Sequence, residues 1–203
     1  MERLKGNDLR IINSRQRITD AFLLLIADKS FRKITVKEII FTADVNRSTF
    51  YHHFEDKWDL RDQYVKNTIS CLMAAFKNID YRVPINIETI CEFTKISVLE
   101  SYEHVNTYRT LFNPNLEIDV QQEISGIYYT MMMDWISHQP IEFKPQYPSE
   151  LFAEIYAASA VATIKQAFKN NDKNISAEFE AEKTMQMIRK HLEKGFFRSF
   201  IEE

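Results

Sequence analysis

The chain has few of the residues that make tight turns, with three glycines and five prolines among 203 residues. Hairpins and Gly-rich phosphate loops depend on such residues, so their scarcity argues against both and favours long helices. No run of 18 apolar residues occurs and no basic-then-apolar segment opens the sequence, so we predict neither a membrane span nor export. The sequence therefore predicts an all-α, cytoplasmic protein without a membrane partner.

Cysteine is also scarce, and Cys71 and Cys91 form neither a CxxC pair nor a disulfide framework. We expect both to be buried structural thiols. A nucleophile elbow, a Walker loop and a dinucleotide fingerprint are all missing from the sequence. The sequence therefore predicts neither an enzyme with catalytic residues nor a bound cofactor.

Histidine offers little for a metal ion. His52 and His53 are adjacent and would point about 100° apart on a helix, unlike an i, i+4 pair that chelates from one face. We interpret His104, His138 and His191 as isolated from other ligand types. The prediction is therefore that the chain has no metal site.

Positive charge is concentrated at one end of the chain. Residues 1–54 carry ten Lys and Arg against six Asp and Glu, a balance of +4, whereas residues 55–203 carry sixteen against twenty-three, a balance of -7. This asymmetry is typical of a small polyanion-facing module joined to a larger acidic body.

The basic end contains one longer and two short predicted helices. Residues 14–28 repeat apolar side chains at helical spacing. Thr35 and Glu38 have the spacing of a capping box that opens the first short helix, and Asn46 can cap the second, which ends near His53. Two short helices joined by a brief turn and braced by a longer one describe a helix-turn-helix module, whose second helix enters the major groove of DNA.

The segment VNRSTFYHHF, residues 45–54, contains this second short helix. Its paired histidines suggest metal and its serine and histidines suggest a nucleophile with its base, but its polar face suits DNA better. Val45, Phe50 and Phe54 fall roughly four residues apart and should face the core. The residues left outside can contact base edges or phosphates, and the helix start at Thr35 offers unpaired amides to a phosphate. The DNA-contact residues predicted from these patterns are Thr35, Arg47, Ser48, Thr49, Tyr51 and His52.

Residues 34–60, ITVKEIIFTADVNRSTFYHHFEDKWDL, resemble the signature of the TetR family of bacterial transcriptional regulators. That signature has Thr, then Ile four residues on, then Ala-x-Val, then Thr-apolar-Tyr-x-x-Phe, and a downstream Lys and Leu. The matching positions are Thr35, Ile39, Ala43, Val45, Thr49, Phe50, Tyr51, Phe54, Lys57 and Leu60. The family usually has glycine in the turn, where this chain has Asp44. Aspartate tolerates a left-handed backbone, but its carboxylate would lie near the DNA face and oppose phosphate there.

The resemblance implies a homodimer with two N-terminal DNA-binding heads on helical bodies, in which the helix from Arg47 to His52 reads double-stranded operator DNA. It also implies that Lys57 contacts the DNA backbone. We therefore assign residues 1–55 to a helix-turn-helix DNA-binding domain and residues 56–203 to a larger helical effector-binding and dimerisation domain.

Six further helices are predicted after residue 55, which makes about nine in all. They are expected at 56–76, 87–102, 108–112, 118–136, 149–169 and 177–200. The helix at 118–136 is apolar nearly all round and should be central. The proline-containing segment 138–148 is the clearest break in this half of the chain.

Methionine and aromatic side chains cluster in the predicted body. They can line an adaptable ligand cavity or fill a core, and the resemblance implies a cavity among the fourth to seventh helices. Few charges fall within the cluster, so an apolar or aromatic small-molecule effector is expected, although its identity is unknown. The candidate ligand-pocket residues are Leu72, Phe76, Phe93, Tyr108, Tyr128, Met131, Met132 and Trp135.

The last two predicted helices are amphipathic. Such a pair suits a four-helix dimer interface, which is where the family usually dimerises, but it can also close the core of a monomer. The candidate dimer-interface residues are Ile155, Ser159, Ala162, Met185, Ile188, Leu192 and Phe196.

Two functions are consistent with these patterns. The first is a ligand-responsive, dimeric DNA-binding regulator of transcription, a repressor that a small molecule releases from its operator. The second is a protein-binding co-regulator with weak or assisted DNA binding, because YEHVNTYRTLF, residues 102–112, resembles a subgroup of the family in which some members act with a protein partner. The salt dependence of binding distinguishes the two functions, since the affinity of a DNA-binding protein for DNA falls steeply as the salt concentration rises.

Overall fold

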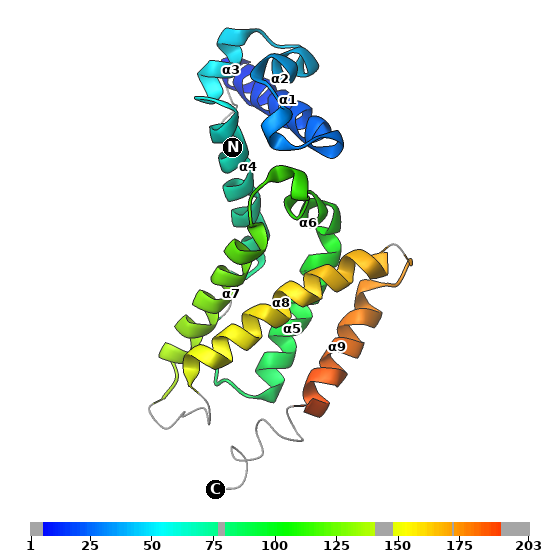
Figure 1. Cartoon of the computed structure of the whole chain (residues 1–203). Helices are drawn as coiled ribbons and strands as arrows, with labels where there is room; N and C mark the ends of the chain where they lie inside the picture. Colours follow the sequence, from blue (N-terminus) through cyan, green and yellow to red (C-terminus); the bar gives the residue numbers. More distant parts are fainter. Residues whose placement is uncertain (1–5, 77–79, 141–147, 172, 192–203) are drawn as a thin grey trace, which may run out of the picture. The chain divides into compact units, whose positions relative to one another are not determined.

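The computed structural model describes residues 6–76, 80–140, 148–171 and 173–191 (Figure 1). Within these ranges every regular element is a helix, which confirms the predicted all-α fold. The α-helices are α1 (Gly6–Asp28), α2 (Val36–Ala43), α3 (Arg47–His53), α4 (Lys57–Leu72), α5 (Ile87–Glu103), α6 (Val105–Leu111), α7 (Val120–Ser137), α8 (Ser149–Asn171) and α9 (Ala177–His191). The short 3-10 helices are η1 (Phe31–Lys33), η2 (Met73–Phe76) and η3 (Pro114–Leu116).

Most helix boundaries lie within a few residues of the prediction. α1 is the exception, because it begins at Gly6 rather than near Ser14. α4 ends at Leu72, and the last part of the helix predicted there is the 3-10 helix η2. The predicted continuation of the last helix beyond His191 lies outside the described residues.

Two compact units divide the chain. The first contains residues 1–70 and 110–119, and the second contains residues 71–109 and 120–203. The first unit is therefore larger than the head predicted at residues 1–55, since most of α4 and the segment around η3 pack with it. The domain boundary after residue 55 stays a prediction. None of the helices that the structure describes combines the length and the hydrophobicity needed to cross a lipid bilayer.

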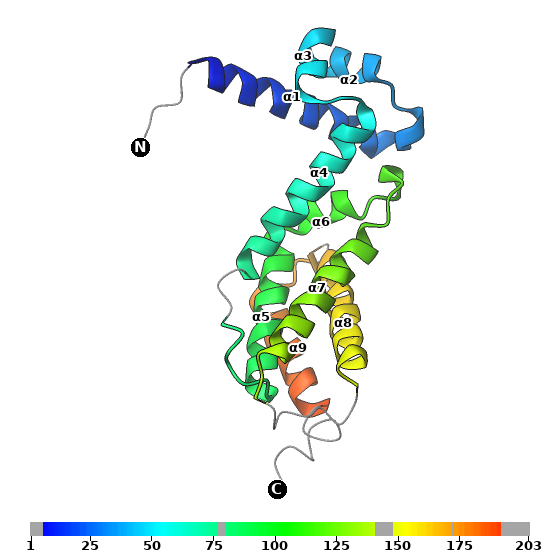
Figure 2. The same cartoon turned by 90° about the vertical axis from the view of Figure 1, so that its left-hand side faces the viewer.

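Apolar side chains from four helices fill the core of the first unit. Phe22 of α1, Ile39 of α2, Phe50 of α3 and Leu60 of α4 are all fully buried. Phe31 of η1 stands edge-on to Phe22, with ring centroids 6.1 Å apart. α2 and α3 both pack on α1 (Figure 2), so the helix-turn-helix arrangement predicted from sequence spacing is present.

The segment 110–119 completes this core from a distant part of the chain. Leu116 is fully buried within the same cluster of apolar side chains. Asn115 Nδ2 donates to the carbonyl oxygen of Ile26 at 2.9 Å, and Asn113 Nδ2 donates to the same oxygen at 3.3 Å. These bonds satisfy an orphan carbonyl in the last turn of α1.

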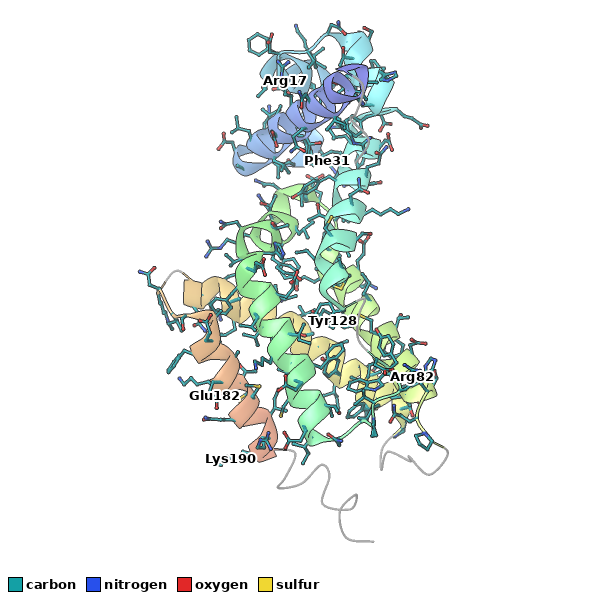
Figure 3. The ribbon with its side chains drawn as sticks, turned by 180° about the vertical axis from the view of Figure 1, so that it is seen from behind. Arg17, Phe31, Arg82, Tyr128, Glu182 and Lys190 are labelled. Atoms are coloured by element: carbon teal, nitrogen blue, oxygen red, sulfur yellow. The ribbon has the colours of Figure 1, made fainter. Side chains whose placement is uncertain are left out.

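The second unit is a helical bundle in which α8 packs on α7 and α5, and α9 packs on α5 (Figure 1). Small side chains of α8 allow the close approach, since Ala153, Ala157 and Ala160 are all buried. Tyr128 of α7 is fully buried and lies among these helices (Figure 3).

One expectation about burial is wrong and another holds for one side of a helix. α7, which is expected to be central, packs along α8 and leaves Gly126 and Thr130 exposed. Its buried stripe is Val120, Ile124, Tyr128, Met132 and Trp135. Cys91 is buried as predicted, but Cys71 near the end of α4 is exposed. Composition shows that a segment is apolar; which of its sides finds a packing partner depends on the other helices.

Candidate nucleic-acid interface

α3 is held at its start by Asn46 and against the core by two phenylalanines. Asn46 Oδ1 accepts from the Thr49 amide at 2.8 Å, which confirms the predicted N-cap. The same oxygen also accepts from the hydroxyls of Ser48 and Thr49, at 2.7 and 2.8 Å. Phe50 is fully buried and Phe54 almost so. An isolated helix of seven residues would be only marginally stable. The Asn46 cap and the two buried phenylalanines therefore stabilise α3 and fix its orientation.

The opposite face of α3 is polar and open. Arg47, Ser48, Tyr51 and His52 are exposed, and Thr49 is half-buried. The Arg47 guanidinium carbon lies 5.4 Å from the centroid of the Tyr51 ring, and Nη2 is 3.5 Å from the Tyr51 hydroxyl. Stacking of a guanidinium on an aromatic ring restricts the flexible arginine side chain to an extended conformation. α3 thus presents a cation, hydroxyls and an imidazole on one short surface.

The turn before α3 contains the departure from glycine noted in the sequence. Asp44 has φ 48° and ψ 53°, the left-handed conformation expected for this turn. Arg17 Nη2 from α1 donates to the Asp44 carbonyl oxygen at 2.7 Å and to Oδ2 at 3.0 Å. The sequence alone did not indicate that Arg17 is the partner of Asp44. The Arg17 guanidinium offsets the negative charge of the Asp44 carboxylate beside the polar face of α3. Figure 3 labels Arg17, which lies on α1 in the first unit.

The start of α2 is a complete capping box. The Glu38 amide donates to Thr35 Oγ1 at 3.3 Å, and the Thr35 amide donates to Glu38 Oε2 at 2.8 Å. The Thr35 hydroxyl also donates to Glu38 Oε2, so its proton is used within the box. A hydrogen bond from Lys29, assisted by Thr35, lowers the pKa of Glu38 to about 2.

Lys57 occupies a different environment from the one the resemblance implies. Its Nζ donates to the carbonyl oxygens of Phe31, Arg32 and Ile34, at 3.1, 3.0 and 2.7 Å. It also lies 4.8 Å from the centroid of the Phe31 ring. These hydrogen bonds from the Lys57 ammonium group join η1 to the start of α4 within the first unit. Contact of Lys57 with the DNA backbone stays a prediction.

The adjacent histidines of α3 separate as the helix geometry requires. His52 is exposed, while His53 is half-buried with Nε2 2.7 Å from Ser14 Oγ of α1. Burial lowers the pKa of His53, and the neighbouring charges of His52 and Arg15 lower it further. The serine beside this histidine comes from α1 and also donates to the Ile11 carbonyl, so the pair fastens α3 to α1.

The candidate pocket residues form an aromatic cluster in the second unit. Phe93 stacks on Phe76 and on Trp135, with centroids 5.4 and 5.6 Å apart, and Phe76 meets Tyr128 edge-on at 5.6 Å. Of the predicted set, Met131 is half-buried. The buried members are Leu72, Phe76, Phe93, Tyr108, Tyr128, Met132 and Trp135.

A cavity of about 390 Å³ lies elsewhere in the same unit, lined by α5, α8 and α9. None of the eight candidate pocket residues lines it. Ile155, Ser159 and Ile188, which the sequence predicted for a dimer interface, do line it. Position along the chain did not reveal this cavity, because three helices distant in sequence form its walls.

The other candidate interface residues have mixed exposure. On α8, Ile155, Ser159 and Ala162 are exposed, and on α9, Met185 and Ile188 are half-buried. Leu192 and Phe196 lie outside the described residues. Their role in dimerisation stays a prediction.

One interpretation of the histidines needs correction. His104 is not isolated from other ligand types, since its side chain and those of Glu100 and Glu103 bring their ligand atoms within 4.8 Å of one another. His104 Nε2 is 3.3 Å from Glu100 Oε1, one helical turn away. His138 Nδ1 likewise lies 3.8 Å from Asp134 Oδ1, so the expectation that these two histidines lack carboxylate neighbours is wrong.

Comparison with known proteins agrees with this geometry. The family model described as bacterial regulatory proteins, tetR family, matches residues 18–64, which hold the last part of α1, all of α2 and α3, and the first half of α4. A search of curated protein sequences finds no match.

Solved structures of similar fold cover nearly the whole chain. The structure titled "Dihydroxyacetone kinase operon activator DhaS" has 15% identity and a TM-score of 0.53, covering 90% of this chain and 96% of that one. A Clostridium perfringens protein described as a fatty acid metabolism regulator has 17% identity and a TM-score of 0.57, covering 86% and 97%. Salmonella enterica GusR has 16% identity and a TM-score of 0.50, covering 90% and 95%.

At these identities the neighbours establish the fold, and the match over residues 18–64 adds the helix-turn-helix head. The capped, anchored α3 with its open polar face is the part of that head that the sequence signature encodes. Residues 18–64 of this chain are therefore the N-terminal helix-turn-helix region of bacterial regulatory proteins of the tetR family.

Proposed function

We propose that this protein is a dimeric repressor of transcription that binds operator DNA through α3 and leaves it when a small molecule binds. One observation carries the DNA-binding half of the proposal. The polar face of α3 is exposed while its apolar face is buried, so the helix can enter a major groove without any change in its own core contacts.

The chemistry of that face suits base reading. Arg47 can donate to guanine O6 and N7, and His52 and Tyr51 can reach phosphate oxygens. The hydroxyls of Ser48 and Thr49 already donate to Asn46, so their oxygens are free to accept from a base amino group. The helix is therefore suited to read a mixed donor and acceptor pattern.

Release by an effector follows from population shift. An effector that favours one conformation of the second unit would change the spacing of two heads in a dimer, and two heads fill successive major grooves only at one spacing. α4 is one of three covalent routes for such a change. The chain passes between the units after Ser70, inside this helix, and again after Arg109 and after Asp119.

The second candidate is a co-regulator that acts with a protein partner. It is favoured by the exposed apolar side chains of α8 and α9, Leu151, Ile155, Phe179 and Met187, which a partner chain could cover. A second copy of this chain would cover them equally well, so we place the repressor first.

The test is fluorescence anisotropy of the purified chain on DNA from immediately upstream of its own coding region. A repressor of its own promoter should bind this DNA in the presence of nonspecific competitor, and log affinity should fall linearly with log salt. Affinity equal to that for random DNA, together with capture of a partner protein at salt concentrations that abolish DNA binding, would favour the co-regulator.

A further inference from the structure

The cavity in the second unit is walled by three helices. α5 supplies Ile90, Thr94 and Ser97, α8 supplies Tyr156 among others, and α9 supplies Met187 and Ile188. α8 and α9 each pack against α5, and the cavity lies where these contacts meet. Its volume, about 390 Å³, is near the lower end of the range in which proteins hold small molecules.

No described side chain that lines this cavity carries a charge at neutral pH. A ligand carboxylate or ammonium would lose its water there and gain no counter-ion, which is unfavourable. Much of the lining is apolar and includes Ile90, Phe152, Ile155 and Met187. The flexible Met187 side chain can adapt its shape to a bound molecule. The cavity therefore selects uncharged, mainly apolar molecules.

The serine and threonine hydroxyls of its lining already donate their protons to backbone carbonyls. Thr94 Oγ1 donates to the Ile90 carbonyl at 2.8 Å, and Ser97 Oγ donates to the Phe93 carbonyl at 3.0 Å. At the exposed side, Ser159 Oγ donates to the Ile155 carbonyl at 2.8 Å. Each of these oxygens can still accept a hydrogen bond but has no proton to give.

Tyr156 also lines the cavity, and its phenol can donate a hydrogen bond. The Tyr156 phenol neighbours the Ser97 hydroxyl, and burial raises its pKa well above the ordinary value, so the phenol stays protonated. The fully buried phenol of Tyr128 also neighbours Ser97. A ligand group at this end meets both acceptors and a donor, and a hydroxyl is the simplest neutral group that does both.

We propose that the cavity between α5, α8 and α9 binds an uncharged, mainly apolar molecule that carries a hydroxyl group, and that this molecule is the effector. The second half of the proposal rests on the ligand-responsive function proposed above.

The test uses three probes of equal chain length on the full protein: n-octanol, octanoate and octylammonium. Isothermal titration calorimetry should show saturable binding of n-octanol and binding more than about tenfold weaker for either ion, since neither charge finds a partner. Octanoate or octylammonium binding as tightly as n-octanol would overturn the proposal, as would a lack of saturable n-octanol binding.

Variants locate the binding. Ser97→Ala should weaken n-octanol binding about tenfold through loss of one hydrogen bond. Ser101→Ala is the matched control, because Ser101 is a buried α5 serine with the same kind of backbone bond, to Ser97 O at 2.6 Å, and does not line the cavity. Thr163→Trp enlarges a half-buried residue of the lining that is not among the dimer-interface candidates, and it should fill the cavity while the fold is kept. Unchanged n-octanol affinity in both Ser97→Ala and Thr163→Trp would show that the alcohol binds elsewhere.

The same samples are then assayed on upstream DNA by anisotropy. Release of specific DNA by n-octanol in the wild type, but not in Thr163→Trp, supports the effector assignment. Specific DNA binding without any alcohol binding leaves the repressor in place and removes this inference. Alcohol binding without specific DNA binding keeps the ligand site and contradicts the repressor.

Discussion

The Arg47 guanidinium lies over the Tyr51 ring, so these two side chains of α3 present one donor surface to DNA. Replacing Arg47 by Ala removes the arginine of that helix and should weaken specific binding by about 1–3 kcal/mol, with relaxed preference at one base pair. Anisotropy on the operator and on a set of single base-pair variants measures both effects. Arg82→Ala is the matched control, since Arg82 is an exposed arginine of the second unit. Equal behaviour of the two variants would show that α3 does not read DNA through this face.

Lys57 gives a second prediction at the scale of one residue. Lys57→Met leaves three carbonyl oxygens near η1 without their donor, so the free energy of unfolding should fall by about 1–3 kcal/mol. Urea unfolding followed by circular dichroism measures this change, with Lys66→Met, an exposed lysine on the same helix, as the control. Unchanged stability and a salt slope of DNA binding reduced by about one would instead support the phosphate contact that the family resemblance implies.

At the scale of an element, the start of α2 should make folding sensitive to acid. The folded pKa of Glu38 is about 2, below its ordinary value of 4.5, so the carboxylate stabilises the fold fully above pH 4.5. This contribution is lost as the pH falls from 4.5 through about 2. Acid unfolding followed by circular dichroism should therefore show a weaker pH dependence in this window for Glu38→Gln than for the wild type. Glu123→Gln, an exposed glutamate in the first turn of α7, should follow the wild type. Identical acid curves for all three proteins would rule out this role.

The elements also show what the sequence could and could not predict. Thr35 with Glu38 and Asn46 with Thr49 were predictable, because a cap and its amide lie three residues apart. The contact between Arg17 and Asp44 was not, since 27 positions separate them and only the packed helices bring them together. The cavity was missed for the same reason, because aromatic and Met content locates a core but not the gap between three helices.

At the scale of the whole molecule, the proposed dimer should bind as two chains to one operator. Two heads on one duplex gain affinity from each other, so an operator cut to one half-site should bind about 10²-fold more weakly than the full site. Sedimentation velocity and anisotropy at stoichiometric concentration measure the number of chains per duplex and the affinity, with a scrambled half-site of equal length as the control. Saturation of the full operator by a single chain would contradict the dimeric arrangement.

The segment 110–119 has a consequence for how the protein is made. Leu116 fills the core of the first unit and Asn115 binds the end of α1, yet both are translated long after residue 70. At the usual speed of bacterial or eukaryotic ribosomes, the roughly 50 intervening residues take on the order of 3–10 s to synthesise. The nascent head therefore stays incomplete during that interval, with the floor of its core open. A ribosome stalled between residues 70 and 110 would hold a DNA-binding head that has every residue of α1 to α3 but not its finished core.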